Sequence, residues 1–243
     1  MSLELLGDSI DVHTGGIDLR FPHHEDERAQ SEAAVGHEVV RRWVHGEHLL
    51  AEGRKMAKST GNVILVRDVH DRGFDPLSVR MFYLTGRYRQ QMNLTWDALA
   101  GADRRLTRWR NRVADWAEAP STAMCADYVE RLTAAFDDDL DTPTALVVLA
   151  DLEKDDEVPA GSKFETFAWV DRILGLDLVR DVGKPRASTE DLPAGARELL
   201  ERRATARAAK DWAESDTLRE QLAGLGVAVT DGPDGQSWSV SGR

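Results

Sequence analysis

Two lysines three residues apart lie in a short stretch that is bounded by glycines. The stretch has the sequence KMAKS and places its cations at Lys55 and Lys58. An ammonium group supplies a point charge and hydrogen-bond donors, so two of them in a loop can stabilise the negative charge on a departing pyrophosphate. A solvated surface loop is the simpler interpretation of these five residues taken alone.

A second candidate site is a glycine pair that follows a predicted strand. The sequence HTGGID places His13, Gly15 and Gly16 just before Asp18. Glycines after a strand allow a ligand to approach the backbone, and an acid just beyond them can bind ribose hydroxyls. Alone, the pattern is more typical of a turn with an incidental acid.

An imidazole and a carboxylate share one face of the next predicted helix. His23 and Glu27 are four residues apart in the sequence PHHEDE, which begins at Pro22. Such a pair supplies half of the ligands of a four-coordinate zinc site. The alternative is a polar helix start whose acids complement the positive end of the helix dipole.

Short strands and helices must position these residues. Alternation with turn glycines predicts a strand, and a proline followed by polar residues predicts a helix start. The expected elements are a strand within 9–20, a polar helix from Pro22 to near Gly36, a strand or buried segment at 38–50, a glycine-bounded loop at 53–62, and a helical piece at 79–84 that starts at Pro76.

The rest of the chain is mainly helical in pattern. Leu106, Trp109, Val113 and Trp116 recur at helical spacing, which is typical of an amphipathic helix. Asp211 opens a capping-box pattern. The expected elements are helices at 98–117, 126–136, 142–152, 163–176, 194–209 and 211–224, a linker at 177–192, and strands at 227–229 and 238–240 joined by a turn at 231–235.

The composition excludes several classes of protein and of binding site. The 243 residues are 42% hydrophobic and 30% charged, so the chain can bury a core. A formal net charge of −12 argues against a general nucleic-acid binder but leaves room for a local basic surface. The single cysteine, Cys125, excludes an internal disulfide framework and a zinc site built mainly from thiolates. We expect a cytoplasmic protein without a membrane span or a signal peptide.

Taken in order, the three motifs closely resemble those of cysteinyl-tRNA synthetases. The glycine turn, the His-His-Glu stretch and the lysine loop occur within the first 60 residues. The lysine loop corresponds to the KMSKS signature of that family, with Ala57 in place of the first serine. The resemblance covers essentially the whole chain. Further matching segments are residues 11–31, 43–45, 139–143, 207–212 and 231–233.

The resemblance implies that cysteine is activated with ATP and transferred to cysteine tRNA. It assigns pyrophosphate departure to Lys58 together with Lys55. ATP, with Mg²⁺, is assigned to Lys58, His13, Gly15, Gly16 and Asp18. Two features of the family have no counterpart in this sequence, the HIGH motif and both zinc-binding cysteines. We therefore expect no adenylate formation by the chain alone, because orientation of ATP carries much of the rate.

The resemblance also implies a zinc ion that binds the thiolate of the substrate, held here by His23 and Glu27. A soft thiolate is a far better zinc ligand than a hydroxyl, so zinc would discriminate cysteine from serine. Because only two protein ligands are assigned, we expect weak zinc binding. Tight binding would require a substitute ligand, for which His24 and His13 are the candidates.

Anticodon contacts are implied for four residues, Arg207, Trp212, Asp216 and Asp231. Asp211 is predicted to cap the second of two helices, which sets Trp212 in its first turn and Asp216 one turn later. An exposed aromatic ring can stack an unpaired base for about 1–3 kcal/mol. The alternative is that Trp212 packs between the helices and the charges are solvated.

The expected fold class is α/β plus mainly α. By resemblance, a partial class I Rossmann-type catalytic domain occupies residues 1–60, and a stem-contact region follows at 61–97. A helical bundle is expected at 98–180 and a small mixed anticodon-binding domain at 194–243. Half of a parallel sheet leaves exposed strand edges.

Two other functions remain open. One is a non-catalytic tRNA-binding protein derived from the synthetase. A lower alternative is a mycothiol-type cysteine ligase, which joins cysteine to an amino sugar and lacks the tRNA-recognition region that residues 194–240 supply. The expected partners are cysteine, cysteine tRNA and a separate N-terminal half, and the expected state is a monomer.

Overall fold

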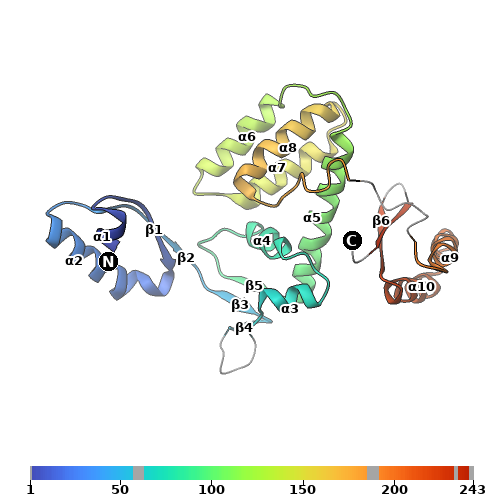
Figure 1. The fold of residues 1–243 in the computed structure, drawn as a ribbon, viewed down its shortest axis with the longest axis horizontal. Helices are drawn as coiled ribbons and strands as arrows, with labels where there is room; N and C mark the ends of the chain where they lie inside the picture. The colour runs from blue at the N-terminus through green and yellow to red at the C-terminus, as the bar shows by residue number, and fades with distance from the viewer. Residues whose placement is uncertain (1, 57–62, 185–191, 233–234, 241–243) are drawn as a thin grey trace. The chain divides into compact units, whose positions relative to one another are not determined.

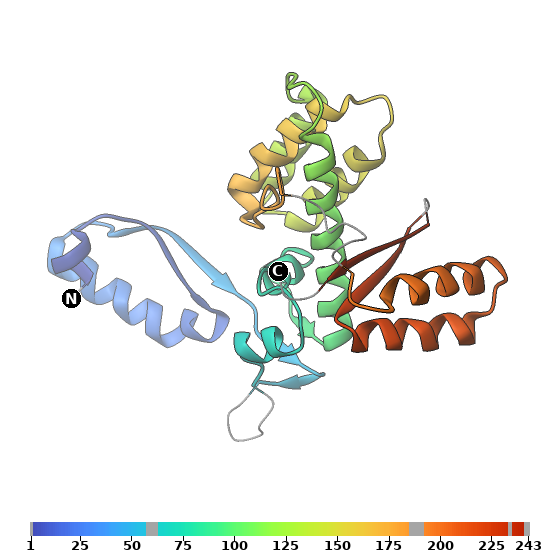
Figure 2. The same cartoon turned by 45° about the vertical axis from the view of Figure 1, so that its right-hand side comes forward.

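The computed structural model describes residues 2–56, 63–184, 192–232 and 235–240. The chain divides into two compact units, Met1–Val182 and Gly183–Arg243 (Figure 1, Figure 2). The expected boundaries at 60 and 97 lie inside the first unit and remain predictions.

A parallel pair of strands opens the first unit. Strands β1 (Ile10–Gly16) and β2 (Val40–Gly46) are in register from one end to the other. The helix α2 (Glu25–Val35) forms the crossover that parallel strands require (Figure 1). This sheet contains no third strand among the described residues, so each strand keeps an unpaired edge. The remaining elements here are α1 (Ser2–Leu6) and the short turns η1 (Ile17–Leu19) and η2 (Arg20–His24).

The start of α2 differs from the prediction. The sequence suggests a start at Pro22, whereas the regular helix begins at Glu25. Phe21 is extended (φ −141°, ψ 135°), as the residue before a proline tends to be, and an irregular turn follows it. The predicted end is confirmed, because Gly36 caps the helix in a left-handed conformation with φ 79°.

A small three-stranded sheet follows that the sequence does not predict. Strand β3 (Leu49–Ala51) pairs antiparallel with β4 (Arg54–Lys55) and parallel with β5 (Met92–Leu94). Strands this short carry too little alternation to detect. The expected loop at 53–62 is therefore wrong in its first part, and residues 57–62 lie outside the described residues. Two helices intervene, α3 (Val66–Asp71) and α4 (Leu77–Leu84), the latter starting after Pro76 as predicted.

Four longer helices provide most of the core of the first unit. They are α5 (Trp96–Trp116), α6 (Ala126–Asp137), α7 (Thr142–Lys154) and α8 (Ala160–Leu174), and they confirm the predicted helices to within a few residues. Trp109 and Phe167 are fully buried, and their rings meet edge to face with centroids 5.5 Å apart. No helix in the described ranges is long and apolar enough to cross a membrane.

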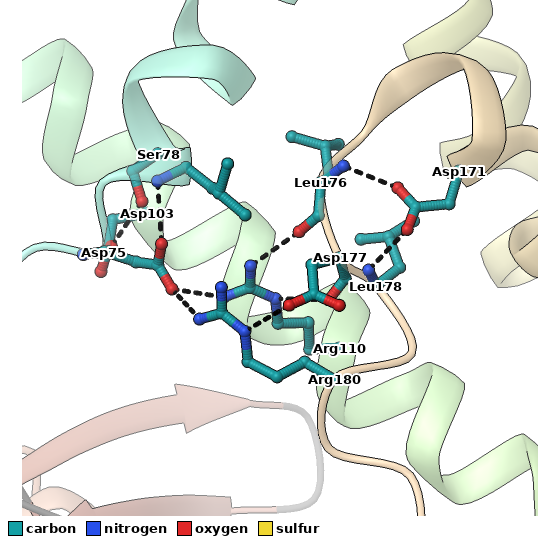
Figure 3. A network of polar contacts seen from close by, with 10 residues as sticks. Asp75, Ser78, Asp103, Arg110, Asp171, Leu176, Asp177, Leu178 and Arg180 are labelled. Carbon is teal, nitrogen blue, oxygen red and sulfur yellow. Dashed lines mark hydrogen bonds and ion pairs between the residues drawn. The ribbon is translucent and has the colours of Figure 1, made fainter.

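A polar network fastens the segment after α8 to the start of α4 (Figure 3). Arg110 of α5 is buried and donates to the carbonyl oxygens of Leu176 and Asp177, at 2.6 and 3.0 Å. The same guanidinium donates to Asp75, which also accepts a hydrogen bond from Arg180. The chain that leaves the bundle is therefore held by hydrogen bonds to a buried charge.

The second unit is a helical hairpin followed by a strand hairpin. Its elements are α9 (Ala196–Ala208), α10 (Trp212–Gly224), β6 (Val227–Gly232) and β7 (Gly235–Val240), with the two strands antiparallel. A small core of Ala196, Leu200, Leu222 and Val227 joins helices and sheet. The predicted elements are confirmed, although the strands are longer than expected, and residues 233–234 of the predicted turn lie outside the described residues.

Candidate active site and nucleic-acid interface

The two glycines of the predicted turn are the last residues of strand β1, opposite the end of β2, and the turn η1 follows them. Gly15 pairs with His45 and Gly16 with Gly46. A Cβ atom on Gly15 would lie 2.6 Å from Cε1 of His24, so only glycine lets this imidazole reach the strand. Ligands of parallel sheets bind at the carboxyl ends of the strands, so the turn lies where a nucleotide is expected.

Three side chains of types that can hold a metal ion converge beside these glycines. One ligand atom from each of His13, His24 and Glu27 lies within 4.8 Å of the other two. His13 comes from β1 and Glu27 from the first turn of α2, and Nε2 of the former is 3.2 Å from Oε2 of the latter. That oxygen is buried and makes no hydrogen bond, which is unusual for a carboxylate.

Of the predicted zinc pair, Glu27 belongs to this cluster and His23 does not. Nε2 of His23 lies 3.7 Å from Oε1 of Glu27, and the His23 side chain is 58% exposed. The structure therefore brings Glu27 together with His13 and His24, the two residues considered as substitutes, and leaves His23 at the outside. Helical spacing alone could not find His13, because it lies on a strand.

His24 has the most enclosed side chain of the cluster. Its residue is 4% exposed, and its Nδ1 lies 2.9 Å from Nε2 of His45. Burial, and then the neighbouring imidazoles of His13 and His45, lower the pKa of His24 below its ordinary value. A neutral imidazole is the form that binds metals. The sequence does not indicate that His24 and His45 meet in a partly buried contact, because they lie 21 residues apart.

The residues predicted for ATP are only partly described. His13, Gly15 and Gly16 all belong to β1. The Asp18 side chain is 61% exposed, with Oδ1 4.0 Å from Nε2 of His48. Lys55 lies at the end of β4 and is exposed. Lys58 falls outside the described residues.

The predicted anticodon residues lie at the junction of α9 and α10. Asp211 caps α10, since its carboxylate accepts the backbone N–H of Glu214 at 3.1 Å. Trp212 is 56% exposed, so the alternative that it packs between the helices is wrong. The guanidinium carbon of Arg207 lies 5.6 Å from the centre of the Trp212 ring. Asp216 is exposed one turn later.

Asp231 is placed through its backbone. It lies in β6 opposite Gln236 of β7, near the end of the strand hairpin. Its side chain is outside the described part of the chain. The described side chains therefore offer an aromatic ring, a cation and a carboxylate on one helical junction.

Comparisons with known proteins agree with this arrangement at both ends of the chain. Residues 1–104 match the family model of the class I (C) tRNA synthetase catalytic domain, and residues 189–238 match that of the cysteinyl-tRNA ligase anticodon-binding domain. The chain belongs to the cysteinyl-tRNA synthetase family. The parts that match correspond to the C-terminal part of such synthetases.

Relatives of this synthetase family align along nearly the whole chain. The chain is 41% identical over 238 residues to a cysteine–tRNA ligase of Opitutus terrae, covering 98% of this chain and 50% of the relative. It is 40% identical over 259 residues to a cysteine–tRNA ligase of Thermus thermophilus, covering 99% and 53%. The chain thus spans about half the length of the curated relatives it matches.

A solved structure supports the synthetase fold. An Agrobacterium radiobacter K84 LeuRS, crystallised as a ternary complex with tRNA and LeuAMS, aligns with a TM-score of 0.53 and 18% identity. The alignment covers 68% of this chain and 26% of that one. The expected class I catalytic fold with a helical continuation is therefore confirmed.

Proposed function

We propose that this chain supplies the C-terminal part of a cysteine–tRNA ligase, which activates cysteine with ATP and transfers it to cysteine tRNA. The observation that carries the proposal is the cluster of His13, His24 and Glu27 at the carboxyl end of a parallel strand pair. A site for a thiol substrate and a site for a nucleotide then lie side by side. The anticodon-binding match at 189–238 supports tRNA as the acceptor.

ATP is assigned to the carboxyl end of β1 and the turn that follows it. Gly15 and Gly16 leave the backbone open to the adenosine, and the exposed carboxylate of Asp18 is suited to the ribose hydroxyls. His13 lies in the middle of the same strand, three residues before Gly16. Lys58 with Lys55 would hold the β- and γ-phosphates, which Mg²⁺ accompanies, and stabilise the departing pyrophosphate.

The residues present fit a zinc ion. Two imidazoles and a carboxylate are ligands that zinc takes, and three protein ligands with one open position are typical of catalytic zinc. The buried Oε2 of Glu27 makes no hydrogen bond, although it lies 3.2 Å from Nε2 of His13, and a cation bound between the two atoms would satisfy it. When bound, zinc supplies a Lewis acid that holds the thiolate of cysteine. We assign it to Glu27 with His24 and His13, and His23 adjoins them.

A non-catalytic tRNA-binding protein is the second candidate function. The exposed Trp212 beside Arg207 favours it, because this surface needs no catalytic domain. The lower alternative, a mycothiol-type cysteine ligase, is disfavoured by the anticodon-binding match.

Cysteine-dependent pyrophosphate exchange tests the main proposal. We expect background exchange from this chain alone and clear exchange once a polypeptide with the N-terminal half of the Thermus thermophilus relative is added. Exchange should disappear when the added half is combined with the Lys58→Ala variant. Absent exchange in every combination, with tRNA binding retained, would favour the binding protein over the ligase.

A further inference from the structure

The turn between β3 and β4 determines where Lys55 lies. Ala51 pairs with Arg54 across a two-residue turn, and Lys55 is paired one position further along. Lys55 ends β4 and is the first lysine of the KMAKS stretch. Because a two-residue turn sets the register of both strands, a change at Glu52 or Gly53 is transmitted to Lys55.

Glu52 is held in a conformation that its residue type disfavours. Its φ is 50° and that of Gly53 is 74°, and a type I′ turn requires a positive φ at both central positions. Asparagine, aspartate and glycine dominate such turns, whereas a positive φ costs energy for a glutamate. A contact of the Glu52 side chain offsets this cost.

The contact is a cap on the first turn of α5. Oε1 of Glu52 accepts the backbone N–H of Trp96, the first residue of the helix, at 3.0 Å. The N-cap residue Thr95 serves another amide, that of Ala98, at 3.1 Å. Amides of the first turn have no partner within the helix, and a carboxylate there also complements the helix dipole. One side chain therefore joins the turn before Lys55 to a helix of 21 residues (Figure 1).

Two further hydrogen bonds join the same turn to β5. The N–H of Glu52 donates to the carbonyl oxygen of Leu94 at 3.0 Å, and the N–H of Gly53 donates to Oδ1 of Asn93 at 2.8 Å. Together with the cap on α5, these contacts form a tether of three hydrogen bonds. The tether fixes both central residues of the turn to the segment that leads into α5.

The anchor of the tether is itself held in place. The ring of Trp96 stacks on that of Phe74, with centroids 6.4 Å apart and an angle of 14° between the planes. The guanidinium carbon of Arg72 lies 3.7 Å from the centre of the Trp96 ring. Leu99, one turn further along α5, is fully buried. The tether therefore ends on a part of the chain that packs on the core.

We infer that Glu52 is a positioning residue for pyrophosphate departure, because its tether to α5 holds the end of β4 and with it Lys55. The inference rests on the proposed ligase function, in which Lys55 contacts the phosphates and Glu52 acts only through it. A cation that is already in place loses little freedom as charge develops on the leaving group, which is a source of rate.

Two substitutions separate the tether from the turn. Glu52→Asn introduces a residue that favours the type I′ turn, but it shortens the side chain by one methylene and withdraws the acceptor from Trp96. Glu52→Gln keeps the length and an acceptor oxygen. If Glu52 served only the stability of the turn, Glu52→Asn would equal or exceed both wild type and Glu52→Gln. We expect the opposite order.

Cysteine-dependent pyrophosphate exchange measures the effect, with the full chain combined with the N-terminal half of the Thermus thermophilus relative. Glu52→Asn should lower kcat about tenfold and leave KM for ATP within about twofold, since a misplacement of about 1 Å can cost 100-fold in rate. Glu52→Gln should stay within about threefold of wild type. Asp97→Asn is the control, because Asp97 lies in the first turn of α5 but takes no part in the tether. Its kcat should match that of wild type.

Amide hydrogen exchange in the full chain alone reports the tether without catalysis. The Trp96 amide should exchange about tenfold faster in Glu52→Asn than in wild type, and at close to the wild-type rate in Glu52→Gln. An unchanged Trp96 amide or an unchanged kcat in Glu52→Asn, or an equal loss of kcat in both substitutions, would overturn the positioning role and leave the ligase proposal intact. Absent pyrophosphate exchange by wild type with the added half would count against the proposed function, and against this role with it.

Discussion

The buried guanidinium of Arg110 lies 2.6 Å from the carboxylate of Asp75, across 35 positions of sequence. Arg110 belongs to α5, and Asp75 lies two residues before the start of α4 (Figure 3). The second partner of Asp75, Arg180, comes from the segment after α8. One carboxylate therefore joins three segments that are distant in the chain.

We expect Asp75→Asn to destabilise the first unit by about 2–3 kcal/mol. The variant leaves the buried charge of Arg110 without its counter-ion, which is costly, although two carbonyl oxygens still accept from it. Urea unfolding followed by circular dichroism measures the change. Asp151→Asn is the matched control, because Asp151 pairs with Arg131 at the surface and should contribute less than about 1 kcal/mol. Equal effects of the two variants would contradict the special position of Asp75.

The contribution of Asp75 should depend on pH. Partial burial raises its pKa, but the N–H of Leu77 and the guanidinium groups of Arg110 and Arg180 outweigh burial, so the pKa of Asp75 is lowered. A carboxyl whose pKa is depressed by folding stabilises the protein above its unfolded pKa of about 3.9 and loses this effect as the pH falls further. The difference in unfolding free energy between wild type and Asp75→Asn should therefore be full at pH 7 and shrink below about pH 4. A constant difference from pH 7 to pH 3 would argue against this assignment.

The sequence predicts the elements of this fold where the pattern is long and local. Leu106, Trp109 and Val113 share one buried stripe of α5, and Gly36 ends α2, as their spacing and type indicate. The sheet of β3, β4 and β5 is not predicted, because its strands are two or three residues long and β5 pairs with a strand some 40 residues earlier.

The sequence predicts the site residues that lie within one element, but not those that different elements bring together. The spacing of His23 and Glu27 identifies one side of a helix, whereas His13 and His24 join Glu27 through the packing of that helix on β1. Packing also explains why Gly15 is required: its missing side chain leaves room for the ring of His24. Contacts of this kind depend on the tertiary fold, which the local pattern does not contain.

Gly15→Ala should weaken metal binding. A Cβ at this position would lie 2.6 and 2.9 Å from Cε1 and Nε2 of His24, so the imidazole must leave its present position in the cluster. Displacing a ligand costs metal affinity, and we expect a loss of about tenfold or more. Titration with Co²⁺ followed by visible absorption reports the affinity. Gly101→Ala serves as control, because its Cβ would meet only Nη2 of Arg104, at 3.8 Å. Unchanged affinity in Gly15→Ala would remove His24 from the set of ligands.

Two sets of zinc ligands can be distinguished by mutation. One is the sequence-predicted pair of His23 and Glu27, and the other is the cluster of His13, His24 and Glu27. Glu27 belongs to both, so Glu27→Gln should reduce zinc affinity in either case. The geometry places His24 inside the cluster and His23 at its exposed side, so His24→Asn should reduce affinity more than His23→Asn. Equilibrium dialysis against zinc compares the three variants. A greater loss in His23→Asn would show that the helical pair, rather than the buried cluster, binds the metal.

Trp212→Ala should weaken binding of cysteine tRNA by the full chain. Because the indole is 56% exposed and contributes little to the core, the variant should remain folded. Loss of one stacked base corresponds to about 1–3 kcal/mol, or about 5- to 150-fold in affinity. Trp212→Phe keeps an aromatic face beside Arg207 and should retain most of the binding. Filter binding at fixed ionic strength measures both, since salt alters every phosphate contact.

An anticodon-mutated tRNA separates specific recognition from general attraction. With the wild-type chain, it should bind more weakly than cysteine tRNA, and Trp212→Ala should bring the two affinities together, because the lost contact is one to a base. The net charge of −12 makes strong attraction to phosphates alone an inadequate source of affinity. If the Trp212→Ala variant keeps the full preference for cysteine tRNA, the indole takes no part in recognition, and the exposed ring beside Arg207 needs another explanation.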